Sequence, residues 1–493
     1  MQFIITAAGS GNRFSSAGYN LPKHLLPFDE KQNILDKILN CAPAEADKLV
    51  ISNKTHYKKT QENTKGKCTF KQIDDHKNGP VFTLSQSREG INNDEVLISY
   101  CDFVSFFDFK RFEDFKNQND FDAIIFCYTG FHPNFLTNED PAFIQKNKNA
   151  VLKIQEKKPF TDNKEEELAS DGLYYFKSKD ILLECIDECL FNDEFKINNE
   201  FYVTALCEYL IKNHYKVGYF LVDFTITLGT PLFYEEYLKW SSINLYRKKI
   251  QLDYPLYITA AGEGIRFNKK DKPFLQLNDK TFLEQSINNF NCNKGTVLGI
   301  REDQKKHNAK FENIVYFNKT TKGPAETLKK MLDKKGPSKD KGFFVNGCDY
   351  LVEFDQNHLE RLLRLNPDAI ISVSNRNFFA ETHPKSFSWP QIKKQEVKCM
   401  FIKDYPFKNE PPYKNFMYTG FTWFKNKNIF LAGYKNLKHQ AGEIYVENVI
   451  QELITSGKTV LALSSSYYGF GTPQELNCFI FWLNFLKKDK REN

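Results

Sequence analysis

Short apolar runs alternate with amphipathic stretches along the first half of the chain. Runs rich in β-branched and aromatic residues predict strands, and they lie at 3–6, 49–52, 95–99, 123–127 and 217–222. Between them, residues 34–39 and 203–212 carry apolar side chains at helical spacing, which predicts helices. Strands that alternate with helices indicate an α/β fold with a mostly parallel sheet covered on both faces. In such a sheet the ligand binds at the carboxyl ends of the strands.

The chain repeats this pattern as a whole. The segment FIITAAGSGNRF at 3–14 returns as LYITAAGEGIRF at 256–267. Shorter landmarks recur in the same order, namely Gly79-Pro80 and Gly323-Pro324, Cys101-Asp102 and Cys348-Asp349, Gly172 and Gly420, Glu200 and Glu443, and Gly229-Thr230-Pro231 and Gly471-Thr472-Pro473. A chain of 493 residues also exceeds the size that one hydrophobic core usually supports. We therefore expect two tandem domains, at 1–245 and 254–493, joined by the polar link Arg247-Lys248-Lys249.

Composition and charge narrow the classes of function. Hydrophobic residues make up 41% of the chain and aromatic residues 15%, which is typical of a globular protein. The net charge of +6 arises from 68 basic and 62 acidic residues, so we expect no nucleic-acid partner. The 11 cysteines lack the spacing of a zinc site, and no apolar run is long enough to span a bilayer. We expect a cytoplasmic protein without membrane insertion, and an oligomer is compatible with this composition.

A glycine loop follows the first predicted strand of each half. It reads Ala8-Gly9-Ser10-Gly11 in the first half and Ala261-Gly262-Glu263-Gly264 in the second. Such a loop presents backbone N–H groups with no side chain to obstruct a phosphate, although a tight connection alone would also explain it. The loop is neither a dinucleotide-binding nor a Walker A motif, because Phe14 replaces the third glycine and no Gly-Lys-Ser/Thr follows. Basic residues that could offset the charge of a triphosphate follow in both halves, namely Arg13 and Lys23, and Arg266 and Lys272.

The pattern A-A-G-x-G-x-R, followed by P-K or K-P, resembles the signature of the nucleotidyltransferases that activate sugar phosphates. The resemblance covers both halves. It implies two tandem Rossmann-like, GT-A-type domains, each with a mostly parallel mixed sheet flanked by helices. It also implies that the glycine loops hold a nucleoside triphosphate, with Arg13 and Arg266 on its outer phosphates and Lys23 and Lys272 on the reacting phosphate. Gly79-Pro80 and Gly323-Pro324 are expected beside the nucleobase.

An aspartate follows an apolar run in each half, Asp102 after 96–99 and Asp349 after 343–347. A carboxylate at the carboxyl end of a strand is well placed to hold Mg²⁺, and the resemblance implies this role. The alternative is that each aspartate caps the next turn. The family also implies a second metal-binding acid near the Gly-Thr-Pro segment, but Thr227 and Gly469 occupy the matching positions. Asp223 is a poor substitute by its spacing.

The first half also contains the segment VLKIQEKKP at 151–159, which resembles the V-E-K-P segment of the family. The resemblance implies that Glu156 and Lys157 bind the acceptor. The second half reads FIKDYP at 401–406, and we expect this Glu-Lys pair to be lost there. Further residues expected near the acceptor are Gly172, Glu200, Gly420 and Glu443. Each of these glutamates could equally be an acid at the start of a helix.

The resemblance implies an enzyme that joins a nucleoside triphosphate to a phosphorylated sugar, polyol or related metabolite and releases pyrophosphate. The opening loop resembles cytidylyltransferases slightly more than the sugar uridylyltransferases, which favours CTP, and a tandem protein of this kind implies a surface-polysaccharide precursor. Two alternatives remain. One is a GT-A glycosyltransferase, which the missing D-x-D motif disfavours, and the other is one catalytic half beside a regulatory nucleotide-binding half. Because only the first half keeps the Glu-Lys pair, we expect loss of Lys23 to reduce activity more than loss of Lys272.

Overall fold

The computed structural model describes residues 1–493 except 93, 138, 244–248, 269–270, 308–310, 376, 408–409, 411–413, 438–441 and 493. The chain divides into two compact units, Met1–Tyr237 (unit 1) and Leu238–Asn493 (unit 2). The division falls within helix α8 (Pro231–Ser242). Residue 245, where we expect the first domain to end, and the expected link residues Arg247 and Lys248 lie outside the described residues.

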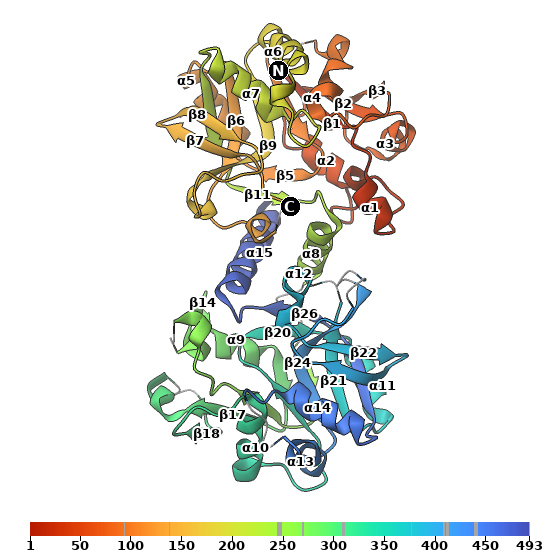
Figure 1. Cartoon of the computed structure of the whole chain (residues 1–493), viewed down its shortest axis with the longest axis vertical. Helices are drawn as coiled ribbons and strands as arrows, with labels where there is room; N and C mark the ends of the chain where they lie inside the picture. Colours follow the sequence, from red (N-terminus) through yellow and green to blue (C-terminus); the bar gives the residue numbers. More distant parts are fainter. Residues whose placement is uncertain are drawn as a thin grey trace. The chain divides into compact units, whose positions relative to one another are not determined.

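In its described part, unit 1 is built on a nine-stranded sheet with the order β3-β2-β1-β4-β9-β6-β10-β8-β7 (Figure 1). The strands are β1 (Gln2–Ala7), β2 (Asp47–Asn53), β3 (Thr69–Ile73), β4 (Val96–Tyr100), β6 (Ala123–Tyr128), β7 (Phe143–Asn147), β8 (Ala150–Gln155), β9 (Leu168–Phe176) and β10 (Val217–Leu221). Strand β1 pairs in parallel with β2 and β4, whereas β9 runs antiparallel to both of its main neighbours, β4 and β6. The predicted mixed sheet and the five predicted strands are confirmed.

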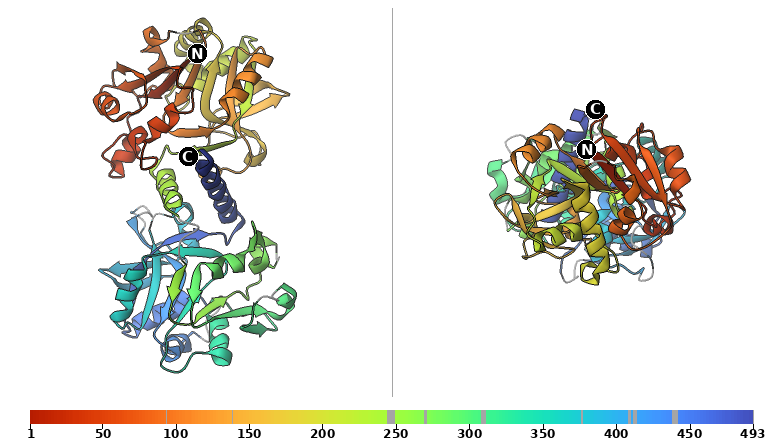
Figure 2. Two further views of the ribbon diagram at one scale, coloured as in Figure 1. Left: turned by 180° about the vertical axis from the view of Figure 1, so that it is seen from behind. Right: turned by 90° about the horizontal axis from the view of Figure 1, so that it is seen from above.

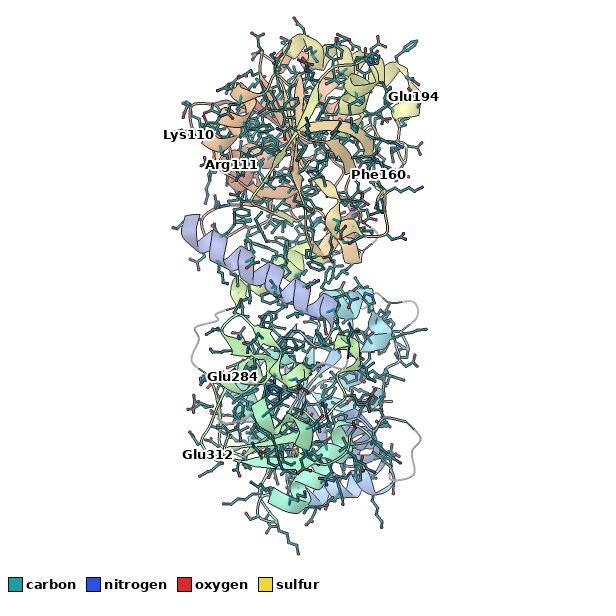
Figure 3. The ribbon with its side chains drawn as sticks, turned by 90° about the vertical axis from the view of Figure 1, so that its left-hand side faces the viewer. Lys110, Arg111, Phe160, Glu194, Glu284 and Glu312 are labelled. Atoms are coloured by element: carbon teal, nitrogen blue, oxygen red, sulfur yellow. The ribbon has the colours of Figure 1, made fainter. Side chains whose placement is uncertain are left out.

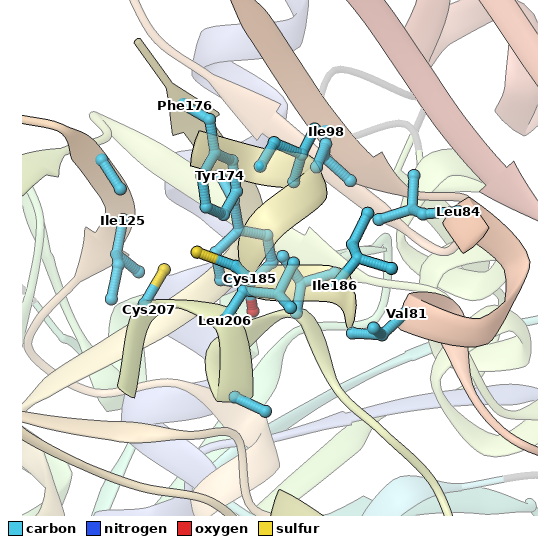
Figure 4. Packing of buried hydrophobic residues seen from close by; sticks show 14 of the residues in the cluster. Val81, Leu84, Ile98, Ile125, Tyr174, Phe176, Cys185, Ile186, Leu206 and Cys207 are labelled. Carbon is cyan, nitrogen blue, oxygen red and sulfur yellow. The ribbon is translucent and has the colours of Figure 1, made fainter. Parts of the chain in front are cut away.

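Three helices cover one face of this sheet, α4 (Pro80–Ser85), α6 (Lys179–Phe191) and α7 (Val203–Lys212). Their apolar side chains meet those of the strands in one core (Figure 4), among them Val81, Leu84, Ile186, Leu206, Ile98 and Ile125, all less than 1% exposed. Full burial of each such side chain stabilises the fold by about 1.5–3 kcal/mol. The core therefore fixes the strand ends at which a ligand would bind.

The opposite face of the sheet is covered by aromatic side chains around helix α5 (Phe109–Gln118). The ring of Phe112 lies 4.8 Å from Phe126 and 5.5 Å from Phe220, measured between centroids. On the outer side of α5, Arg111 pairs with Asp223 at 2.7 Å (Figure 3). The remaining elements of unit 1 are α1 (Asn12–Ser16), α2 (Ile34–Leu39), α3 (Tyr57–Asn63) and the strand pair β5 (Phe103–Phe106) with β11 (Phe224–Thr227). The helices predicted at 34–39 and 203–212 are thus confirmed as α2 and α7.

Unit 2 repeats this sheet, with the strand order β18-β17-β13-β19-β24-β21-β25-β23-β22 in its described part. The strands are β13 (Leu256–Thr259), β17 (Thr296–Arg301), β18 (Ile314–Phe317), β19 (Phe343–Asn346), β21 (Ala369–Ser374), β22 (Trp389–Lys393), β23 (Glu396–Phe401), β24 (Met417–Phe424) and β25 (Val460–Ser464). The helices are α9 (Phe282–Asn288), α10 (Pro324–Lys335), α11 (Gln356–Arg364), α12 (Phe378–Thr382), α13 (Lys427–Lys435), α14 (Val446–Thr455) and α15 (Pro473–Glu492). The strand pair β20 (Tyr350–Glu353) with β26 (Ser466–Gly469) corresponds to β5 with β11.

All four tryptophans of the chain lie in unit 2 (coloured from yellow-green to blue in Figure 2), namely Trp240, Trp389, Trp423 and Trp482. Trp240 lies at the end of α8 and packs edge-on against Phe479 of α15, with 5.1 Å between the ring centroids. It also stacks on Trp482 at 6.4 Å. The four side chains are almost fully buried, so they belong to the core of this unit.

Among the described residues, no helix combines the length and the apolar character needed to cross a membrane.

Candidate active sites

The glycine loop of unit 1 follows β1 directly and is open to solvent. Gly9 and Ser10 are exposed, and a Cβ added to Gly9 would meet no atom within 4 Å. Gly11 has a φ of 68°, a left-handed conformation that glycine adopts without strain. Asn53, the last residue of β2, donates from Nδ2 to the carbonyl oxygens of Ala8 (3.0 Å) and Gly9 (3.3 Å). These carbonyls are therefore tied to the sheet, and the exposed surface of the loop is left for a ligand.

Unit 2 has the same loop in the same conformation. Gly264 also has a φ of 68°, and a Cβ on Gly262 would meet no atom within 4 Å. Arg301, the last residue of β17, takes the place of Asn53 and donates to the carbonyl oxygen of Gly262. The exposed Glu263 stands where unit 1 has Ser10. The second loop thus carries a negative charge that would oppose a phosphate.

A lysine and an aspartate form a partly buried ion pair next to each loop. In unit 1, Lys23 Nζ lies 2.6 Å from Asp102 Oδ2, and the two side chains are 24% and 17% exposed. Lys23 belongs to a short 3₁₀ turn, and Asp102 follows the carboxyl end of β4. Burial is the largest single influence and lowers the pKa of Lys23, but the opposing effects, chiefly the charge of Asp102, together hold the pKa above its usual value. The lysine is therefore a fixed positive charge at any working pH.

In unit 2, Lys272 pairs in the same way with Asp349, which follows β19. Burial again lowers the pKa of the lysine, whereas the charge of Asp349 raises it, and the pKa lies above its usual value. The structure thus brings together the predicted lysine and aspartate twice, in the same position of each sheet. The predicted arginines lie at the rim, where Arg13 pairs with Glu139 at 3.2 Å and Arg266 is exposed.

The aspartate of each site suits a metal ion. A Cβ added to Gly229 would lie 2.7 Å from Asp102 Oδ2, and one added to Gly471 would lie 2.6 Å from Asp349 Oδ2. Only glycine therefore lets the backbone come this close to each carboxylate, because any side chain would strike it. Among the described residues no three His, Cys, Asp or Glu side chains gather as a metal site. A carboxylate at the carboxyl end of a strand, beside the glycine loop, fits Mg²⁺, which takes its remaining ligands from substrate phosphates and water.

Unit 2 places a second carboxylate beside its glycine. The Cβ position of Gly471 lies 3.3 Å from Oε2 of Glu475, which belongs to the first turn of α15. Burial, and then the charge of Asp349, raise the pKa of Glu475. The sequence pattern does not indicate Glu475, because the resemblance implies the second acid on the strand before Gly-Thr-Pro and not on the helix after it. Phe233 stands at the same distance from the Gly-Thr-Pro segment of unit 1, and Asp223 pairs with Arg111 instead.

The Gly-Pro segments begin helices α4 and α10, each with proline in the first turn. Gly79 and Gly323 have φ values of 88° and 128°. A Cβ on either would lie 2.6 Å from a backbone oxygen, that of Phe201 or Ile444. Only glycine allows this close approach. The structure therefore joins each Gly-Pro segment to the segment that carries Glu200 or Glu443.

The residues expected at the acceptor of unit 1 lie where β8 meets the start of α7. Thr204 Oγ1 donates to Glu156 Oε2 at 2.6 Å, and burial raises the pKa of Glu156. Lys157 Nζ donates to Tyr202 Oη at 2.6 Å and lies 4.6 Å from the centre of its ring. Glu200 precedes the N-cap residue Tyr202, so it lies outside the first turn of the helix. Gly172, with a φ of 94°, packs against the Phe103 ring.

Unit 2 lacks the Glu-Lys pair of unit 1 but keeps a lysine at the equivalent position. Lys403 follows β23 as Lys157 follows β8, and their φ values are 51° and 56°. The ammonium of Lys403 lies over the ring of Tyr445, at 5.4 Å, and Tyr445 Oη donates to Glu443 Oε2 at 2.7 Å. The lysine is therefore present, and only the glutamate is replaced, by Ile402. The sequence signal was a lysine two residues past the strand in both halves.

Comparison with protein families finds a nucleotidyltransferase match in each unit. The nucleotidyl transferase family matches residues 2–241, and the MobA-like NTP transferase domain matches residues 256–395. The chain carries two nucleotidyltransferase domains in tandem. The predicted fold class and the predicted class of enzyme, a nucleotidyltransferase, are thereby confirmed.

Solved structures similar to this tandem nucleotidyltransferase each cover about half of it. One is the nucleoside-diphosphate-sugar pyrophosphorylase from Vibrio cholerae RC9, with 20% identity over 48% of this chain and 99% of that chain, and a TM-score of 0.39. Another is the inositol-1-phosphate CTP transferase from T. maritima, with 16% identity over 47% of this chain and 94% of that chain, and a TM-score of 0.37. No curated protein matches the nucleotidyltransferase in sequence.

Proposed function

We propose that this nucleotidyltransferase joins a nucleoside triphosphate to a phosphorylated sugar or polyol and releases pyrophosphate. The observation that carries this proposal is the Lys-Asp pair beside an open glycine loop at the carboxyl ends of parallel strands, Lys23 with Asp102 and Lys272 with Asp349. A fixed cation and free backbone donors are the groups that a triphosphate needs.

The proposed reaction is an in-line attack. A phosphate oxygen of the acceptor forms a bond to the α-phosphorus, and the bond from that phosphorus to the pyrophosphate oxygen breaks. The loop and Arg13 hold the departing phosphates, while Lys23 stabilises charge on the α-phosphate. Mg²⁺, when bound at Asp102, would neutralise phosphate charge. Lys157 would bind the acceptor phosphate, and Glu156 a hydroxyl of the acceptor.

We propose CTP as the nucleotide, because the opening loop resembles cytidylyltransferases slightly more than the sugar uridylyltransferases. We further propose that the product is an activated precursor for surface polysaccharide, a role that the family resemblance implies, and that the reaction takes place in the cytoplasm. A screen that crosses CTP, UTP, GTP, ATP and dTTP with a panel of phosphorylated sugars and polyols tests the reaction. Pyrophosphate release is expected from at least one pair, with the highest kcat/KM for CTP. No release from any pair would refute the proposed reaction, and a preference for another nucleotide would refute CTP alone.

A further inference from the structure

The acceptor regions of the two units keep the same lysine but differ in two neighbouring side chains. In unit 1, Glu156 follows β8 and faces Thr204, the second residue of α7. The equivalent positions of unit 2 are Ile402, after β23, and Glu447, the second residue of α14. The carboxylate thus comes from the hairpin in unit 1 and from the helix in unit 2, where an isoleucine takes its place on the hairpin.

Glu447 is held in a defined setting. Its side chain is 7% exposed, and Oε1 accepts a hydrogen bond from Ser388 Oγ at 3.1 Å. The backbone N–H of Lys403 also donates to Ser388 Oγ, at 3.3 Å. Ser388 therefore connects the carboxylate to the lysine that follows β23. In unit 1 the carboxylate and the lysine are adjacent in sequence, as Glu156 and Lys157.

A tyrosine and a small hydroxyl residue near these carboxylates also exchange positions between the two units. A tyrosine and a small hydroxyl residue are hydrogen-bonded to each other in both units, Ser170 to Tyr174 at 2.9 Å and Tyr418 to Thr422 at 2.7 Å. Along the chain, the tyrosine follows its hydroxyl partner in β9 and precedes it in β24. The two regions therefore hold similar groups in different places, which is expected of two repacked pockets rather than of one working and one decayed pocket.

Each carboxylate also lies among three tyrosines. Burial is the main cause that raises the pKa of these tyrosines, and the nearby carboxylate adds to it. The tyrosines are Tyr100, Tyr174 and Tyr202 around Glu156, and Tyr350, Tyr418 and Tyr445 around Glu447. The two carboxylates thus occupy equivalent surroundings, although they come from different elements.

We propose that Glu447 is the acceptor-binding carboxylate of unit 2, which binds a hydroxyl of a phosphorylated acceptor whose phosphate binds Lys403. This assignment rests on the proposed nucleotidyl transfer. Because the carboxylate enters from the helix and not from the hairpin, it reaches a different part of the acceptor. The two units therefore prefer different phosphorylated sugars or polyols.

The test uses the full chain with Lys23→Ala, which leaves unit 2 as the working site. Pyrophosphate release is measured with CTP against glucose 1-phosphate, inositol 1-phosphate and the rest of the acceptor panel. Glu447→Gln in this background is expected to raise the KM for the acceptor ~10-fold or more, since a hydrogen bond to a charged group is lost. The KM for CTP is expected to stay unchanged. The matched control, Glu360→Gln on the exposed surface of α11 in the same background, is expected to leave both values unchanged.

A second variant keeps the test decisive if Glu447→Gln destabilises the fold. The double substitution Ile402→Glu with Glu447→Thr copies the arrangement of unit 1 into unit 2. It is expected to retain pyrophosphate release and to shift the acceptor preference of unit 2 towards that of unit 1, which is measured with Lys272→Ala. Thermal melting followed by circular dichroism shows whether each variant is folded.

Two results would overturn the assignment. One is an unchanged acceptor KM in the folded Glu447→Gln variant. The other is the absence of pyrophosphate release from the Lys23→Ala chain when the wild-type chain is active. If the wild-type chain itself releases no pyrophosphate with any pair, the proposed reaction fails first, and the assignment of Glu447 fails with it.

Discussion

At the residue scale, the Lys-Asp pair decides what each site can do. In each unit the pair puts one positive charge beside the glycine loop and one carboxylate at the carboxyl end of a strand. The carboxylate keeps the lysine protonated despite its burial. When substrate binds, its phosphates would pair with the lysine and a metal ion would pair with the carboxylate. In the absence of both, the lysine and the aspartate neutralise each other.

Lys23→Ala is expected to lower the kcat for pyrophosphate release by unit 1 about 10²–10³-fold, as loss of a preorganised charge does. Lys272→Ala acts on unit 2 in the same way. The total loss is expected to be larger for Lys23, because Glu263 adds a negative charge to the second loop. Lys110→Ala, on the surface of α5, is the control. Activity that survives in the double variant of Lys23 and Lys272 would contradict the role of both lysines.

Glu475→Gln is expected to weaken metal binding at unit 2 alone. The substitution removes the second carboxylate that faces Gly471, while Asp349 remains. Titration with Mn²⁺, followed by electron paramagnetic resonance, measures the affinity of the full chain without turnover. We expect one class of sites to weaken about tenfold. An unchanged titration would show that Glu475 takes no part in metal binding.

The buried Asp171 makes the stability of unit 1 depend on pH. Its carboxylate accepts hydrogen bonds from Ser105 Oγ (2.6 Å) and the amide of Leu173 (3.0 Å), but burial raises its pKa to about 6. The folded state therefore holds the proton more tightly than the unfolded state. This group contributes stability below about pH 4, which is lost as the pH rises through about 6, and the change amounts to about 3 kcal/mol.

Asp171→Asn is expected to remove this pH dependence. Urea-dependent hydrogen exchange on peptides from β9, between pH 4 and pH 7, reports the stability of unit 1 locally. The wild-type chain should lose protection relative to the variant as the pH rises. Parallel pH profiles of the two chains would contradict the buried, titrating carboxyl.

At the scale of elements, glycines of the site differ in what they contribute. Gly9→Ala is expected to leave the melting temperature unchanged, because the added Cβ meets no atom, but to raise the KM for the triphosphate. Gly79→Ala is expected to lower the melting temperature, because its φ is 88° and its Cβ would strike the Phe201 carbonyl. Melting curves together with KM values separate the two effects. Equal melting temperatures for the two variants would contradict this distinction.

The part of the fold and of the site that could be predicted from the sequence is the part that local patterns determine. The strands, the glycine loops and the positions of Lys23 and Asp102 follow from local patterns that occur twice in one order. Glu475 and Glu447 could not be found in this way. Each comes from the first turn of a helix that the fold brings to a strand end, and no local pattern marks that approach. The Glu-Lys pair is absent at 402–403, as expected, but Lys403 keeps the place of Lys157 after the strand and only the glutamate is replaced, which a motif of two adjacent residues does not indicate.

At the scale of the whole molecule, the chain is a tandem of two nucleotidyltransferase domains that differ in side chains at equivalent positions. Both sheets keep one strand order in the described residues. The loop anchor changes from Asn53 to Arg301, and the acceptor carboxylate from the hairpin to the helix. Each unit contains its own loop, ion pair and acceptor region, so each of the two sites is complete within one unit.

The distribution of tryptophan gives these two halves different optical properties. Unit 1, Met1–Tyr237, contains no tryptophan, whereas unit 2 contains all four. Fluorescence excited selectively in indole therefore comes from the second repeat, because the first repeat has no tryptophan to emit. The emission of these buried indoles can thus be used to follow the unfolding of the second repeat in the intact chain, without separating the repeats or labelling either of them.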